Sequence, residues 1–172
     1  PGRCLVEWMC SDNSTLHHEA ASRATRSIRI TKQSCDFDKR NGFECAMRVL
    51  DAIPEVIGLV ISIPCTAWCS WHDLNLHKYG RSYQVYLDRI RQASTLQLKI
   101  AFRAGDKVIA KGGRVFFEWP RFSKGQGLLI LQRWVDKHGL FFADIDGCQV
   151  GVTGKDGEPA KKPWGIWNND QH

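Results

Sequence analysis

The sequence Val56-Ile-Gly-Leu-Val-Ile-Ser-Ile63, followed by Pro64-Cys65-Thr-Ala-Trp-Cys-Ser-Trp71, decides the expected fold. Its first eight residues are almost all apolar and rich in β-branched side chains, which is typical of a strand buried on both faces of a parallel sheet. In open α/β sheets, ligands bind beyond the carboxyl ends of the strands. Cys65, directly after the proline, is therefore predicted to lie at the functional edge of the sheet.

The composition predicts one globular domain covering residues 1–172. The chain has 172 residues, of which 43% are hydrophobic and 24% charged, as in soluble proteins of this size. No apolar run approaches the roughly 18 residues of a transmembrane helix. The net charge of +6 permits a nucleic-acid partner without requiring one. Protein partners in a larger assembly are the other expectation.

The seven cysteines show no regular disulfide framework, because their number is odd and the chain has long periodic apolar segments. We expect reduced thiols and an intracellular location, which would be nuclear, cytoplasmic or organellar and not secreted. The sequence begins with neither a methionine nor a signal peptide. It is therefore expected to be part of a longer chain or a processed product.

Apolar segments of strand and helix type alternate along the chain. Strands are expected at residues 4–6, 27–30, 56–63, 114–117, 140–143 and 164–167, helices at 16–24, 43–50, 83–110 and 128–138, a loop at 72–80, and turns or a hairpin at 144–162. This alternation predicts an α/β, Rossmann-like fold with a mostly parallel sheet and helices on both faces. The strand that leads to Pro64 should be central.

Three of these strands are expected to end in residues that can act as an acid, a base or a nucleophile: Glu7, Cys65 and Glu118. A single acid at such a place more commonly caps a helix or binds backbone amides. Three strand ends of this kind, one of them carrying a cysteine behind a proline, favour a site. Because the carboxyl ends of parallel strands meet at one edge, the three side chains should converge there.

At these positions the chain resembles a known family, the DNA cytosine-C5 methyltransferases. The resemblance rests on four segments. The family's Pro-Cys-Gln-x-Phe-Ser loop is similar to Pro64-Cys65-Thr66-Ala67-Trp68-Cys69, and its Glu-Asn-Val motif is similar to Phe117-Glu118-Trp119-Pro120. Its first S-adenosylmethionine-binding strand and loop resemble Leu5-Val6-Glu7-Trp8-Met9-Cys10, and the stretch that leads into its final strands resembles residues 144–167. The segments follow the family's order, with a longer insert between Cys65 and Glu118.

The resemblance implies a transferase that uses S-adenosylmethionine to methylate cytosine in DNA or RNA. A cysteine thiolate would attack C6 of the base, and a protonated carboxyl group opposite N3 would stabilise the charge in the ring. The base would be flipped out of its duplex. The resemblance assigns catalysis to Cys65 and Glu118, cofactor binding to Glu7, Trp8, Cys10, Asp36 and Pro64, and substrate binding to Trp68, Trp119 and Lys162.

Several departures from the family pattern support an alternative function. The first loop contains no glycine, Thr31 replaces an acid so that Asp36 is the nearest candidate, and Lys161-Lys162-Pro163-Trp164 replaces a Gln-x-Arg-x-Arg motif. There is also no room for a target-recognition domain. The alternative is a catalytically inactive methyltransferase-like domain that serves as a binding or structural subunit of a larger assembly.

Two further expectations concern the cysteines. Cys65, Cys69, His72 and His77 could together bind zinc, but their spacing is less regular than in common zinc sites, so no metal is expected. Cys65, on a loop near a helix start and basic side chains, is expected to have a depressed pKa and to react with alkylating reagents ahead of Cys45 and Cys148.

Overall fold

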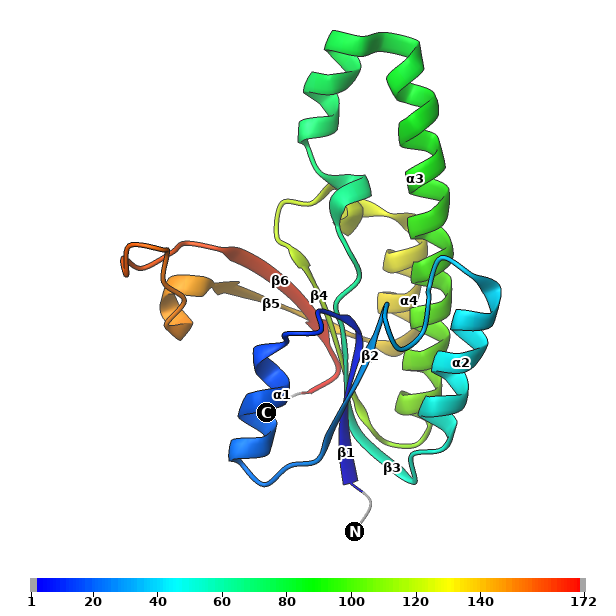
Figure 1. The fold of residues 1–172 in the computed structure, drawn as a ribbon, viewed down its shortest axis with the longest axis vertical. Coiled ribbons are helices and arrows are strands. Elements are labelled where there is room, and N and C mark those ends of the chain that lie inside the picture. The colour runs from blue at the N-terminus through cyan, green and yellow to red at the C-terminus, as the bar shows by residue number, and fades with distance from the viewer. Residues whose placement is uncertain (1–2, 171–172) are drawn as a thin grey trace. The chain divides into compact units, whose positions relative to one another are not determined.

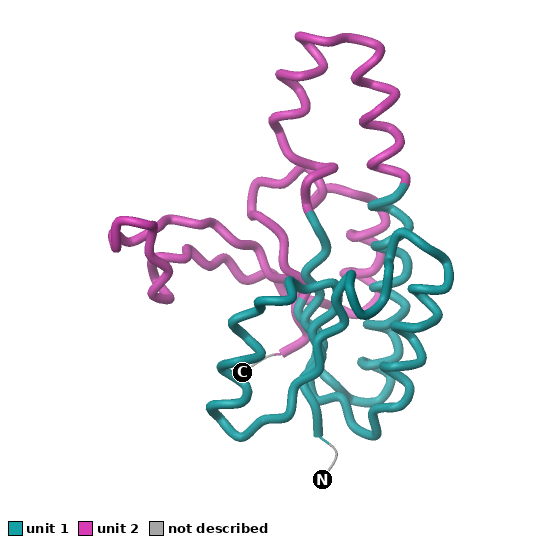
Figure 2. The backbone as a smooth tube through the Cα atoms, in the orientation of Figure 1, with its two compact units in different colours: residues 1–64, 93–116 teal, residues 65–92, 117–172 magenta. Residues whose placement is uncertain are grey.

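The computed structural model describes residues 3–170 and shows an α/β protein with a six-stranded mixed sheet of strand order β2-β1-β3-β4-β6-β5. Its internal contacts divide the chain into two compact units (Figure 2). Unit 1 comprises Pro1–Pro64 and Ala93–Phe116, and unit 2 comprises Cys65–Gln92 and Phe117–His172. Strand β4 (Arg114–Pro120) and helix α3 (Trp71–Ala110) each contribute residues to both units.

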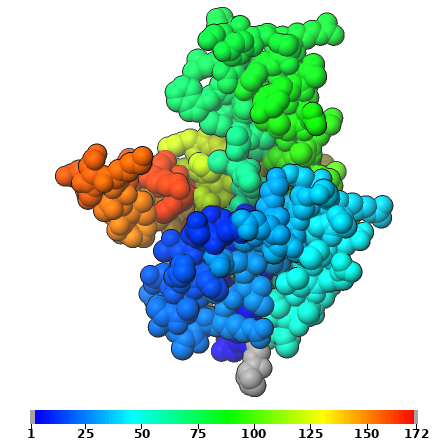
Figure 3. Space-filling model, in the orientation of Figure 1, coloured from blue at the N-terminus to red at the C-terminus, as the bar shows by residue number. Residues whose placement is uncertain are grey.

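Unit 1 is built on three parallel strands, with β1 (Arg3–Cys10) between β2 (Ser27–Thr31) and β3 (Glu55–Ile61). Helices α1 (Thr15–Ser22) and α2 (Arg40–Asp51) connect them. Figure 1 shows α1 on one side of these strands, and α2 with the carboxyl-terminal part of α3 on the other. Both α1 and α2 reach the surface in Figure 3. The parallel pairing brings the carboxyl ends of β1, β2 and β3 to one edge of unit 1.

The centre of unit 1 is apolar, as the sequence predicts for strands covered on both faces. Side chains that are at most 1% exposed include Val6, Trp8, Ile30, Leu59 and Ile61 from the strands and Ala46, Leu98, Ala101 and Ala104 from the helices. Burial of each large apolar side chain stabilises the fold by about 1.5–3 kcal/mol relative to an exposed one. On the helix predicted at residues 43–50, the apolar positions Phe43, Ala46 and Leu50 are buried and Met47 is half-buried.

Unit 2 contains an antiparallel pair, β5 (Phe141–Asp146) and β6 (Pro163–Asn168), with Phe142 opposite Trp167. Helix α4 (Leu129–His138) ends at Gly139, whose φ of 57° is the left-handed conformation common at helix ends. Three short 3₁₀ segments, η1 (Thr66–Trp68), η2 (Lys124–Gly127) and η3 (Gly147–Val150), connect these elements. The turns or hairpin expected at residues 144–162 correspond to the end of β5, η3 and the following segment, in which Thr153 and Pro159 form an antiparallel bridge.

The structure corrects the sequence-based boundaries in three places. Residues 72–80, expected to be a loop, are the first part of α3, because no helix breaker occurs before Gly80 (φ 59°, ψ −138°), where the helix is interrupted. Glu7 and Glu118 lie inside strands that continue to Cys10 and Pro120. The antiparallel β5–β6 pair makes the sheet mixed. The strand leading to Pro64 is central, third of six.

Candidate functional site

The carboxyl end of β1 holds a deeply buried carboxylate. Glu7 is 2% exposed and accepts a hydrogen bond from the hydroxyl group of Ser14. Its Oε1 atom and the indole nitrogen of the adjacent Trp8 have no hydrogen-bond partner among residues 3–170. Buried polar atoms are nearly always paired, so each of these two atoms could accept a polar ligand, although the two side chains point to opposite faces of the strand. Ser14 stands at the N-cap position of α1, but its side chain makes no capping bond and instead donates to Glu7.

The same strand end carries backbone strain that the sequence did not reveal. Met9 has a φ of 59°, a left-handed conformation that favours glycine, and the pairing of β1 with β2 shifts register between Trp8 and Cys10. Bulges and strained residues of this kind cluster at functional sites. Met9 thus adopts a conformation typical of glycine, although the loop that follows β1 contains no glycine.

The topology gives the end of β1 a special position within unit 1. The chain leaves β1 for β2 on one side and then crosses to β3 on the other, and both neighbours are parallel to β1. In doubly wound sheets, ligands bind at such a reversal of strand order. The amide of Ser62 donates to the carbonyl of Trp8 at 3.0 Å, which ties the segment leading to Pro64 to this strand end. Pro64 itself is exposed.

The other two residues with a predicted cofactor role differ in their availability. Cys10 donates its thiol to the Glu7 carbonyl, and burial together with the charge of Glu7 raises the pKa of the Cys10 thiol to about 12. Cys10 therefore stays a neutral thiol. Asp36 follows β2, and its carboxylate forms an ion pair with Lys39 at 2.9 Å, which lowers the pKa of the Asp36 carboxyl group. Asp36 remains an acceptor, but one that already has a partner.

In unit 2, the charge of the predicted acid, Glu118, acts on the predicted nucleophile, Cys65. Cys65 directly precedes η1, and its carbonyl accepts a hydrogen bond from Trp68 N at 2.9 Å. Its thiol is half-buried, and burial is the main reason why the pKa of Cys65 is raised. The negative charge of Glu118 raises it further, whereas Lys162 lowers it. The expectation of a depressed pKa is therefore wrong, because burial outweighs the nearby positive charge.

Glu118 has the properties that the predicted acid requires. The side chain is half-buried on β4, and this burial raises the pKa of its carboxyl group, with Lys162 opposing the shift. The raised pKa lets the group keep a proton at a higher pH than an exposed glutamate. Unit 2 thus brings together three of the predicted site residues: Cys65, Glu118 and Lys162.

The two predicted substrate-stacking tryptophans are placed differently. Trp119 is 1% exposed, with its ring against Phe117 at a centroid distance of 5.1 Å and over Gly125. The structure corrects the stacking role predicted for Trp119, because the ring of this residue offers no exposed face. Trp68 is half-buried, and the Arg91 guanidinium lies 5.2 Å from its ring centroid. That residue therefore still offers part of its surface to a ligand.

The zinc alternative does not fit the contacts of His72. One ring nitrogen lies 2.8 Å from the Tyr83 hydroxyl group, and the other lies 2.6 Å from the Thr66 carbonyl. Both nitrogens are therefore engaged, and none is available to a metal. Within residues 3–170, no three His, Cys, Asp or Glu side chains are grouped so as to hold a metal ion.

No helix among residues 3–170 is long and apolar enough to cross a membrane.

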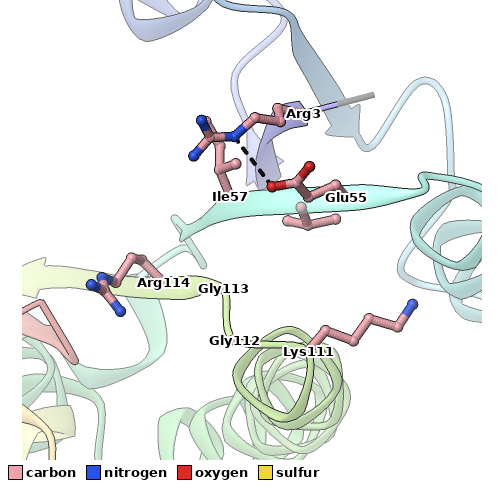
Figure 4. A pocket seen from close by; sticks show the side chains of 8 residues that line it. Arg3, Glu55, Ile57, Lys111, Gly112, Gly113 and Arg114 are labelled. Carbon is pink, nitrogen blue, oxygen red and sulfur yellow. Dashed lines mark ion pairs between the residues drawn. The ribbon is translucent and has the colours of Figure 1, made fainter. Parts of the chain in front are cut away.

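Unit 1 also has two surface hollows away from the carboxyl ends of its strands. One of about 220 Å³ lies at the amino ends, where Arg3 pairs with Glu55 beside Gly113 (Figure 4). The other, of about 620 Å³, lies between α2 and α3. Its lining combines apolar and charged side chains: Phe43, Met47, Leu96, Ile100, Asp38, Lys39, Arg40, Glu44, Lys99 and Arg103. Neither hollow includes a residue with a predicted role.

With this geometry in view, the chain was compared with known proteins. No family model matches it, and neither the curated proteins nor the solved structures yield a match. Support for a function therefore comes from the side chains themselves. Of these, sequence reasoning identified Glu7, Cys65 and Glu118, but it missed the roles of Ser14 and Met9. A hydroxyl group seven residues after an acid and a strained methionine have no recognisable sequence signal.

Proposed function

We propose that this chain is an S-adenosylmethionine-dependent methyltransferase that acts on cytosine in nucleic acid, with Cys65 as nucleophile and Glu118 as acid. One observation carries the proposal: unit 2 holds a half-buried thiol and a half-buried carboxyl group whose pKa is raised by burial, and the charge of that carboxyl group raises the pKa of the thiol. An acid that keeps its proton can donate a hydrogen bond to N3 of a cytosine under attack.

The raised thiol pKa is consistent with this role when the proton on Glu118 is considered. Part of the shift at Cys65 comes from the negative charge of Glu118. Protonation of Glu118 removes that repulsion, so the acid form of Glu118 favours the thiolate form of Cys65. The two groups are thus best suited to act together when Glu118 is neutral and Cys65 is ionised.

The reaction then follows from the two side chains. The Cys65 thiolate forms a bond to C6, and Glu118 donates its proton toward N3 as electrons move into the ring. S-adenosylmethionine, when bound, supplies a methyl group on a positively charged sulfur. After C5 has gained the methyl group, loss of the C5 proton to a base and departure of the thiolate restore the aromatic ring, and Glu118 recovers its proton.

The proposed cofactor position is the carboxyl end of β1. The free oxygen of Glu7 can accept from amino or hydroxyl groups of the cofactor. The left-handed Met9 adds backbone strain at this strand end, of the kind that clusters at ligand-binding sites. These features suit the amino acid and ribose parts of the cofactor, which are rich in donors and acceptors.

The test combines binding and transfer. S-adenosylhomocysteine at about 100 times its Kd should stabilise the purified chain by about 2.7 kcal/mol, which a thermal unfolding scan would detect. The cofactor with an isotopically labelled methyl group should label cytosine-containing DNA or RNA oligonucleotides. Cys65→Ser should abolish labelling and keep the stabilisation, whereas Cys69→Ser, on the same loop, should retain both. Absence of any stabilisation would refute the proposal.

A second candidate is the catalytically inactive binding module. The net raised pKa of the Cys65 thiol favours it, because a protonated thiol is a poor nucleophile. Stabilisation by S-adenosylhomocysteine together with no methyl transfer to any cytosine-containing oligonucleotide would support this candidate.

A further inference from the structure

Two cysteines of unit 1 that have no part in the proposed function lie in direct contact. Cys35 follows β2, and Cys45 is in the second turn of α2. The Cys35 thiol is directed at the Cys45 sulfur, with 2.9 Å between the two Sγ atoms. A disulfide bond is about 2.05 Å long. The two sulfur atoms therefore need to approach by only about 0.9 Å to reach the length of a disulfide bond.

The surrounding backbone holds the two thiols in this position. The segment after β2 is closed by a hydrogen bond from Cys35 N to the Thr31 carbonyl at 2.9 Å and one from Thr31 N to the Ser34 hydroxyl at 2.9 Å. The first turn of α2 packs directly on this segment, because a Cβ atom at Gly42 would lie 1.9 Å from the Asp36 carbonyl oxygen. Little movement is therefore open to either thiol.

The two sulfur atoms differ in access to solvent. Cys35 is 3% exposed, whereas Cys45 is half-exposed and contacts the Ser34 carbonyl. Burial and the contact with Cys45 raise the pKa of the Cys35 thiol to about 11, although the charge of Arg48 opposes the shift. A reagent in solution therefore reacts with the accessible Cys45 thiol first. The Cys35 thiol stays buried and protonated next to it.

We propose that Cys35 and Cys45 form a thiol–disulfide exchange site that accepts small disulfides of the glutathione class. The Cys45 thiolate attacks one sulfur of the reagent, whose S–S bond breaks and releases one small thiol. Cys35 then loses its proton and attacks the Cys45 sulfur of the mixed disulfide, releasing the second small thiol. The two protein thiols are oxidised to a disulfide, the reagent is reduced to two thiols, and these carry away the two protons.

The bond would have a structural effect near the strand ends. Phe37, two residues after Cys35, lies between Trp8 and Phe43, with ring centroids 5.8 Å from each. Oxidation would therefore fix covalently the segment that covers Trp8. Because the crosslink constrains the unfolded chain, we expect the oxidised protein to unfold at a temperature higher by about 5 °C. This inference does not depend on the proposed methyl transfer.

The experiment treats the native protein with glutathione disulfide, blocks the remaining thiols by alkylation and digests with trypsin. Cleavage after lysine and arginine places Cys35 in peptide 33–39 and Cys45 in peptide 41–48. The expected product is these two peptides joined by a disulfide and separated again by dithiothreitol. Phenylarsine oxide, which needs two adjacent thiols, should protect both cysteines from alkylation.

Single variants separate the two steps. Cys35→Ser should accumulate glutathione on Cys45, because no second thiol resolves the mixed disulfide, whereas Cys45→Ser should leave Cys35 unmodified. Cys148→Ser, at an exposed position, should behave as wild type. The proposal is overturned if wild-type Cys35 and Cys45 stay fully alkylatable after treatment. It is equally overturned if they link to other cysteines as often as to each other.

Discussion

The end of β1 in unit 1 and the Cys65–Glu118 pair in unit 2 both contain a buried carboxyl group, but the two groups are suited to different tasks. Glu7 is almost fully enclosed, has one hydroxyl partner and leaves one oxygen for a ligand. Glu118 is half-buried among titratable neighbours, and its pKa is raised. Under the proposed function, the unpaired oxygen suits Glu7 to ligand binding, whereas burial, which raises the pKa of Glu118 against the opposing charge of Lys162, suits that group to hold a proton.

The largest expected effect separates these two tasks directly. Glu118→Gln should lower kcat for methyl transfer by about 10²–10⁴-fold, because an acid–base group is lost, with little change in cofactor affinity. Glu7→Gln should weaken cofactor binding by about 1–3 kcal/mol, the usual cost of spoiling a buried hydrogen-bonding arrangement. Calorimetric titration with S-adenosylhomocysteine and single-turnover assays would measure the two effects. Equal losses in both assays for both variants would remove the distinction.

The second prediction concerns two glycines in close contact with their surroundings, Gly42 in unit 1 and Gly125 in unit 2. Gly42→Ala would place a Cβ atom 1.9 Å from the Asp36 backbone, and Gly125→Ala would place one 2.1 Å from the Trp119 ring. Each should lower the free energy of unfolding by about 1–3 kcal/mol, the former by more, because backbone yields less than a side chain. Gly127→Ala, where nothing lies within 4 Å, is the matched control and should stay within about 0.5 kcal/mol. Denaturant titration would rank the three.

The third prediction concerns pH. The pKa of Glu118 is raised in the folded state above its ordinary value of 4.5, so above pH 4.5 the native protein retains a proton that the unfolded chain has lost. Its contribution to stability is full below pH 4.5 and is lost as pH rises through the folded pKa. Glu118→Gln should therefore gain stability relative to wild type as pH rises through this range, and Lys162→Met should shift the window upward. Urea unfolding across pH would show this, with exposed Glu158→Gln as control.

The smallest effect is on thiol labelling. Because the pKa of Cys65 is raised above 9.0, its alkylation should accelerate with pH beyond 9, and exposed Cys148 should be labelled first at neutral pH. Glu118→Gln should speed the labelling of Cys65 several-fold by removing a negative charge. Peptide mapping after brief alkylation would follow each site. A Cys65 that reacts first at pH 7 would restore the original sequence-based expectation.

Much of the fold follows from the sequence because periodic apolar residues report burial. The runs around Leu59 and Phe117 and the helix face of Phe43 and Leu50 are all buried as expected. Residues 72–80 were misassigned because their polar composition resembles a loop, although only Gly80 interrupts the helix. The direction of β6 was not predictable, since apolar residues alternate alike in parallel and antiparallel strands.

The candidate site was predictable only as residue types at strand ends. Sequence position placed Cys65 and Glu118 in the same region, but the sign of the Cys65 pKa shift depends on burial, which competes with the charge of Lys162. Burial also decides between Trp68 and Trp119, two tryptophans of similar context in the sequence. The contact between Cys35 and Cys45 depends on how the loop after β2 meets α2, which no local pattern encodes.

The interruption of α3 at Gly80 has a practical consequence for probe design. The residue and its neighbours Tyr79 and Arg81 are exposed, and a Cβ atom at Gly80 would meet nothing within 4 Å. Exposed turns with open surroundings tolerate inserted sequence well. An epitope tag or a short fluorophore-binding peptide placed after Gly80 would therefore leave both helical arms intact and report on molecules that approach unit 2.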